Sequence, residues 1–117
     1  MLTTNKLFVR GHLGQDPKMF GKVCKVSIGT NQSWKDKDGK RQEKSSWVPV
    51  TILVPKLATW VSENLKKGDP VYCEGHVEQQ SYKDKAGDMI YSTEVIAHIF
   101  DGPKPVPAEI ADEETPF

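Results

Sequence analysis

The sequence has little of what metal centres, disulfide frameworks and membrane spans require. It contains only two cysteines, Cys24 and Cys73, and neither belongs to a C-x-x-C pair, so no zinc site or disulfide framework is indicated. Both lie within alternating apolar patterns, which predicts buried free thiols. The chain also lacks a run of about 18 apolar residues and, near its start, the apolar stretch of a secretory signal. We therefore expect a cytoplasmic protein with no membrane contact.

Motifs of catalysis are missing as well. The three histidines lie on separate predicted strands, without an H-x-x-x-H pair or a nearby pair of carboxylates. No glycine-rich phosphate loop or nucleophile elbow is present. The sequence therefore predicts no catalytic residue, no metal site and no cofactor, and we expect a protein that is not an enzyme.

The net charge is zero, but its distribution along the 117 residues is uneven. Residues 1–100 carry 15 Lys and Arg against 11 Asp and Glu, an excess of four positive charges, whereas residues 101–117 carry one against five. The length is that of one domain. We expect residues 1–100 to form that domain and residues 101–117 to be a short proline-containing linker with an acidic tip. A mildly basic domain is compatible with a nucleic-acid partner without proving one.

Five segments alternate between apolar and polar residues in the manner of half-buried strands. They cover residues 6–13, 23–37, 40–54, 71–82 and 91–100. Turn signals at residues 38–39 and 86–88 indicate two extended hairpins, and one helix of about ten residues is expected between Pro55 and Gly68. This β-β-β-α-β-β order predicts an all-β protein with one short helix, the OB-fold, which is a five-stranded Greek-key barrel.

The alternation assigns side chains to the inside or the outside of this barrel. The residues expected on inward faces are Val48, Val50, Ile52 and Val54 on the third strand, and Val95, Ala97 and Ile99 on the last. Trp47 must then project outward, where an exposed indole needs a ligand or another subunit to cover it. Pro49 cannot donate to a sheet ladder, so we expect it at an edge or a bulge. Trp60, on the helix, is interpreted as a packing residue.

The hairpins interleave aromatic rings with cations. The first carries Trp34, Lys35, Lys37, Lys40, Arg41, Lys44 and Trp47, and the second carries Tyr82, Lys83 and Lys85. Aromatic rings stack on nucleic-acid bases, while ammonium and guanidinium groups neutralise phosphates. The pattern therefore favours nucleic-acid binding over the alternative, in which the hairpins are solvated arms whose rings pack on a neighbour.

The end of the chain has a composition of its own. Prolines recur at positions 103, 105 and 107, and the last six residues are Asp112, Glu113, Glu114, Thr115, Pro116 and Phe117. We expect residues 101–117 to be neither strand nor helix and the acidic tail to be disordered. Acidic charges beside a terminal phenylalanine suit capture by a partner protein that offers a basic rim and an apolar pocket. The alternative is a tail that only aids solubility.

Several of these segments together resemble the bacterial single-stranded DNA-binding proteins. They are LGQDP at 13–17, SWKDKDGKRQEKSSW at 33–47, KLATWVSENLKKGDPVYCEGHVE at 56–78 and the ending DEETPF. The resemblance covers nearly the whole chain and implies a short, divergent member of that family. It implies an OB-fold homo-oligomer, with a tetramer favoured and a dimer as the alternative, that wraps single-stranded DNA without sequence preference at the nucleoid. It also implies that the tip recruits replication and repair proteins.

The resemblance extends to individual residues of the hairpins. Trp34, Trp47 and Tyr82 fall where this family places base-stacking rings, and Tyr82 stands where tryptophan is common. Leu53 occupies a position where the family often has a stacking phenylalanine, so we expect a weaker contact there. Two other functions stay open. One is an interaction module of a primosome-like loading complex, similar to primosomal replication protein N, and the other is an RNA-binding OB domain, since stacking does not distinguish ribose from deoxyribose.

Overall fold

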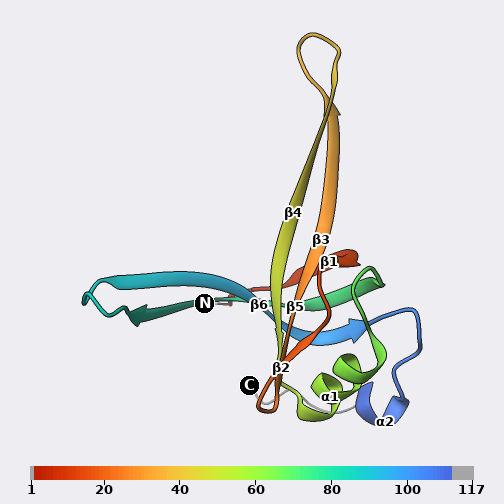
Figure 1. The fold of residues 1–117 in the computed structure, drawn as a ribbon, viewed down its shortest axis with the longest axis vertical. Coiled ribbons are helices and arrows are strands. Elements are labelled where there is room, and N and C mark those ends of the chain that lie inside the picture. The colour runs from red at the N-terminus through yellow and green to blue at the C-terminus, as the bar shows by residue number, and fades with distance from the viewer. Residues whose placement is uncertain (1, 112–117) are drawn as a thin grey trace.

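A computed structural model describes residues 2–111 of the chain (Figure 1). Its strands are β1 (Leu7–Leu13), β2 (Lys18–Phe20), β3 (Val23–Lys35), β4 (Arg41–Ile52), β5 (Pro70–Lys83) and β6 (Met89–Asp101). Its helices are α1 (Pro55–Asn64) and α2 (Ala108–Ala111). Within the described residues, neither helix is long and apolar enough to cross a membrane.

The strands close into a barrel. Their order in the sheet is β1-β5-β6-β4-β3-β2, and β1 also pairs with β3, so the five longer strands form a ring with β2 at its margin. All neighbours are antiparallel except β4 and β6, which pair in parallel at only two positions, Val50 with Val95 and Thr51 with Ile96. This closed five-stranded barrel with a helix between its third and fourth long strands confirms the predicted OB-fold.

The core lies inside the ring and is built from alternate residues of each strand. Val50, Ile52 and Val54 are buried as predicted, and Val48 is half-buried against the same cluster. Cys24 and Cys73 are both fully buried free thiols, also as predicted. Burial raises the pKa of Cys24 to about 11 and that of Cys73 to about 12, so neither thiol forms the reactive thiolate at neutral pH.

Helix α1 covers one end of the barrel (Figure 1). A proline occupies its first turn, where a missing backbone N–H is tolerated, and Leu57, Ala58 and Val61 form its buried face. Trp60 packs against the core cluster, which confirms the packing interpretation.

Pro49 lies at an edge of the sheet, as predicted. On one side of β4 it pairs with Ser27 of β3. On the other side, within the described residues, the pairing of β4 with β6 comprises only the next two residues, Val50 and Thr51.

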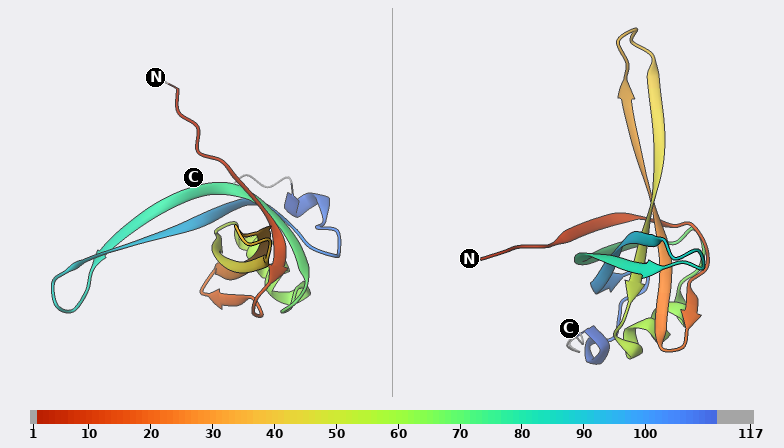
Figure 2. Two further views of the ribbon diagram at one scale, coloured as in Figure 1. Left: turned by 90° about the horizontal axis from the view of Figure 1, so that it is seen from above. Right: turned by 90° about the vertical axis from the view of Figure 1, so that its left-hand side faces the viewer.

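Two hairpins extend beyond the barrel as arms that point in different directions (Figures 1 and 2). We call β3–β4 the first arm and β5–β6 the second arm. The radius of gyration is 16.5 Å, against about 13 Å for a compact domain of this length, because the arms project. Each arm ends in the same kind of turn, with a left-handed glycine, Gly39 in the first and Gly87 in the second.

The last strand departs from regular alternation. Glu74 pairs with Ile99 while Gly75 pairs with Ala97, so one extra residue, His98, is inserted in β6. This bulge reverses which side of the strand faces the core. The prediction that Ile99 faces inward is therefore wrong: its side chain is 46% exposed, and Phe100 is buried in its place.

The segment after β6 is not free of helical structure. Ala108–Ala111 form one helical turn, α2, in which the Ile110 N–H donates to the Pro107 carbonyl. Val106 and Ile110 pack against the core cluster beside α1. The prediction that residues 101–117 contain no helix is therefore wrong for 108–111, because two apolar side chains fold this part of the linker back onto the barrel.

The bulge in β6 leads to a prediction about the stability of two variants. Phe100→Ala should lower the free energy of unfolding by about 3 to 5 kcal/mol, because it empties a filled core position. Ile99→Ala should lower it by less than about 1 kcal/mol, because nearly half of that side chain is already exposed. Urea-induced unfolding of the two variants beside the unaltered chain provides the comparison. A larger loss for Ile99→Ala would show that β6 continues without the bulge.

Candidate nucleic-acid interface

Trp47 projects from the barrel wall and rests on bare backbone. Its side chain is 60% exposed. A Cβ atom added to Gly29 would lie 2.3 Å from Cζ3 of the indole, and one added to Gly14 would lie 2.6 Å from the same atom. The ring therefore occupies the space that side chains at these two positions would take. The prediction that Trp47 faces outward is confirmed. Because the two glycines have no side chains, the ring can lie directly against the sheet.

Trp34 and Trp47 lie on opposite faces of the first arm. The register pairs Trp47 with Gly29 and Trp34 with Gln42, and paired residues share a face while successive residues alternate. Lys35 and Arg41, which pair with each other, fall on the face of Trp47, and Lys44 falls on the face of Trp34. Trp34 is 47% exposed. Each face thus offers one indole and at least one cation.

The turns of the arms use acidic side chains for structure. The Asp36 carboxylate accepts hydrogen bonds from the backbone N–H groups of Asp38 and Lys40 and from the Gln42 amide. These bonds, that of Lys40 foremost, lower the pKa of Asp36. Asp84 accepts in the same way from two N–H groups of the second turn. Both carboxylates are therefore turned toward the backbone, and the lysines of the turns, Lys37, Lys40 and Lys85, are exposed.

The predicted residues form two groups, not one cluster. Tyr82, 57% exposed, and Lys83 lie on the second arm, where they pair with Ile90 and Met89 and so face opposite sides. Figures 1 and 2 show this arm directed away from the first. Leu53 follows the end of β4 and is half-buried. The partner-binding residues predicted at 112–117 lie outside the described part of the chain.

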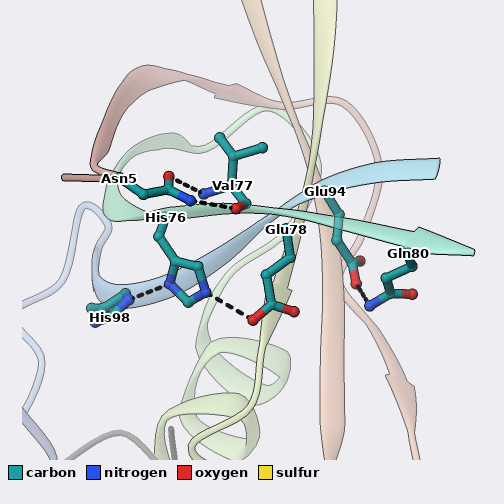
Figure 3. Close-up of polar contacts among 7 residues, drawn as sticks. All are labelled: Asn5, His76, Val77, Glu78, Gln80, Glu94 and His98. Carbon is teal, nitrogen blue, oxygen red and sulfur yellow. Dashed lines mark hydrogen bonds and ion pairs between the residues drawn. The ribbon is translucent and has the colours of Figure 1, made fainter. Parts of the chain in front are cut away.

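A polar strip crosses the outer face of β5 and β6 at the base of the second arm (Figure 3). It consists of His76, Glu78, Gln80, Glu94 and His98. The Glu94 carboxylate accepts hydrogen bonds from the Gln80 amide and from the Thr51 hydroxyl of β4, each at 2.5 Å. The strip is therefore tied to the place where β4 and β6 close the barrel.

The histidines of this strip contact each other and a carboxylate. Nδ1 of His76 shares a hydrogen bond with Nε2 of His98 at 2.7 Å, and Nε2 of His76 lies 2.9 Å from Oε1 of Glu78 (Figure 3). Burial, followed by the charges of His76 and Lys6, lowers the pKa of His98. This imidazole thus adds little positive charge near neutral pH, and the carboxylates of Glu78 and Glu94 make the strip unfavourable for phosphate groups.

The structure also shows exposed aromatic residues and supporting glycines that were not among the predicted site residues. Phe8, Phe20 and Tyr91 are 58%, 58% and 63% exposed. Strand parity could have indicated Phe8 and Tyr91, whereas Phe20 lies in a strand of only three residues. Gly14 and Gly29 support Trp47, but their role depends on contacts between distant segments. The one hint in the sequence is a glycine, which lacks a side chain, at the outward strand position 29.

Both the sequence and the fold are similar to those of known proteins. A sequence profile described as "Single-strand binding protein family" matches residues 4–101. Among solved structures, Plasmodium falciparum SSB in complex with ssDNA has a TM-score of 0.79 at 20% identity, covering 89% of this chain and 98% of that one. A deletion mutant of the single-stranded DNA binding protein from Thermus aquaticus has a TM-score of 0.72 at 18% identity, covering 86% of this chain and 51% of that one. At these identities the two structures establish likeness of fold.

The glycine support for Trp47 can be tested without a ligand. Gly29→Ala should leave the barrel folded and displace the indole, because the colliding atom belongs to the end of an exposed side chain. The indole N–H resonance of Trp47, assigned by its loss in Trp47→Phe, should shift in a two-dimensional NMR spectrum. Ser27→Ala, two residues away on the same strand face, is the control. An unmoved Trp47 resonance in Gly29→Ala would contradict the contact.

Proposed function

Because this chain belongs to the single-strand binding protein family, we propose that it binds single-stranded DNA without sequence preference and protects it during replication, recombination and repair. The observation that carries the proposal is Trp47, an exposed indole that lies against two glycines, on the same face of the first arm as Lys35 and Arg41. A solved relative of the same fold contains ssDNA in its complex, which supports the same ligand here.

Binding would combine stacking with neutralisation of phosphates. Bases stack on Trp47, Trp34 and Tyr82, and Leu53 adds a smaller apolar contact. The cations that neutralise phosphates are Lys35, Lys37, Lys40, Arg41, Lys44, Lys83 and Lys85. Nothing in this scheme reads base edges, so little sequence preference follows. A duplex keeps the faces of its bases inside its own stack and is therefore a poor ligand.

Self-association is part of the proposal. Within the described residues, β1 pairs with β3 only at its last two positions, His12 and Leu13, so the earlier part of its outer edge is open. An open strand edge is a template for pairing with another chain. We favour a homotetramer over a dimer, and native mass spectrometry with and without oligo(dT) distinguishes them.

The tail is proposed to recruit other proteins. The acidic charges of residues 112–114 and the terminal Phe117 suit a peptide-binding pocket on a replication or repair protein. Because α2 folds back on α1, the part of the linker before the tip stays close to the barrel. A captured partner would therefore sit near the barrel.

The stacking proposal predicts a loss of affinity when Trp47 is removed. Trp47→Ala should weaken oligo(dT) binding about five- to a hundredfold, which corresponds to the ~1 to 3 kcal/mol found by alanine substitution in proteins that bind single strands. Leu53→Ala should have a smaller effect. Titrations followed by tryptophan fluorescence measure both, with duplex DNA of equal length and oligo(U) as competitors. Equal binding of the duplex would refute the proposal, and preferential binding of oligo(U) would assign the site to RNA.

Removal of the acidic tip should affect DNA binding and the recruitment of proteins differently. Deletion of residues 112–117 should leave oligo(dT) affinity unchanged or slightly higher, most visibly at low salt, because the carboxylates repel phosphates when screening is weak. The deletion and Phe117→Ala should both abolish co-purification of replication and repair proteins, although Phe117→Ala keeps every acidic side chain. If the deleted and intact chains retain the same proteins, the tail has only a solubilising role.

A further inference from the structure

A third, shorter hairpin carries the same kinds of side chain as the two arms. It consists of β2 and the start of β3. The Phe20 ring is 58% exposed, and the Lys25 ammonium lies 5.7 Å from its centroid. Lys18 pairs with Lys25 across the strands, and Lys22 lies in the turn. Residues 17–27 contain these three lysines and no acidic residue, so their charge is not offset within the hairpin.

This hairpin shares an outer face with Trp47. Alternate residues of β3 enter the core, so Lys25 and Gly29 point outward, and Trp47 covers Gly29. Phe20 pairs with Val23 and lies on the same face, because paired residues of antiparallel strands share a face. From Gly29 to Val23 the strand advances six residues, or about 20 Å at ~3.3 Å per residue. A continuous outer surface therefore runs from the indole to the phenyl ring.

We propose that the β2–β3 hairpin is a third nucleic-acid-binding element, in which Phe20 stacks on a base and Lys18, Lys22 and Lys25 neutralise phosphates. It extends the Trp47 surface along β3 toward the end of the barrel that α1 covers. The inference rests on the function proposed above and adds a site to it. Such a site lengthens the segment of single strand that one barrel holds.

Phe8 shows why exposure alone does not select a ring. It is as exposed as Phe20 and also has a lysine near its face, Lys6 at 5.2 Å. It pairs, however, with Glu74 across the strands, and that carboxylate lies 3.9 Å from the same lysine. A phosphate there would meet a negative charge on the same face. At Phe20 all the charged neighbours on the hairpin are cationic.

The test compares a short and a long single strand. Oligo(dT) of about 5 and about 15 nucleotides lie near the two ends of the site size known for one OB barrel. Phe20→Ala should weaken binding of the longer strand by at least about fivefold, the lower end for loss of one stacked base, and leave the shorter strand unaffected. Met19→Ala, which removes an apolar side chain from the opposite face of the same hairpin, should change neither affinity.

The contribution of Lys18 and Lys25 can be measured separately, from the salt dependence of affinity. Lys18→Gln combined with Lys25→Gln should reduce the salt slope of log affinity for the longer strand by about 1.4, because each single-strand phosphate contact contributes about 0.7. Lys66→Gln combined with Lys67→Gln is the control for the same change in net charge.

The outcomes separate this inference from the function on which it rests. If the unaltered chain bound neither strand, the proposed function would fail. If the unaltered chain bound both and Phe20→Ala bound the longer strand equally well, only the third element would be rejected. Native mass spectrometry without DNA adds one more result that would overturn it: loss of subunit association in Phe20→Ala with unchanged affinity would assign the hairpin to another copy of the chain.

Discussion

The ring of strands has two short junctions, β1 with β3 and β4 with β6, each of two residue pairs, and the positions of the other side chains depend on this closure. Val50 and Thr51 pair in parallel with β6, and the Thr51 hydroxyl donates to Glu94. Once the ring is closed, each strand sends alternate side chains into the core and the others to the surface. The interior of so small a barrel is filled by side chains. Ligand contacts are therefore confined to the outer surface, where Trp47 lies.

Charge on that surface is arranged in zones. Cations lie on the arms and on the β2–β3 hairpin. Among the acidic residues of the arms, Asp36 and Asp84 accept hydrogen bonds from turn N–H groups, and the Glu43 carboxylate lies 3.9 Å from the Arg41 guanidinium. The strip with Glu78 and Glu94, at the closure, is acidic. A polyanion would therefore follow the arms and the hairpin with its phosphates and avoid the strip. The zero net charge of the chain conceals this arrangement.

Residue alternation, the turn signals and the proline and glycine that bound the helix were sufficient to predict the barrel, the two hairpins, the helix and the outward Trp47. It failed where pairing between distant segments decides the outcome. The bulge at His98 inserts one residue and exchanges Ile99 for Phe100 in the core, and three-residue β2 is too short for alternation to reveal. The helical turn around Ile110 forms because α1 offers a surface for it. The opposite faces of the two indoles on the first arm depend on the register that its turn fixes.

In the proposed complex, a single strand lies on Trp47 and along the two arms. Photo-crosslinking of oligo(dT) that carries 5-iodouracil at successive positions, followed by mass spectrometry of the peptides, would locate the strand, because this base reacts with the aromatic ring against which it stacks. We predict adducts on Trp47, Trp34 and Tyr82. Adducts confined to β1, at Phe8, would contradict this placement of the strand.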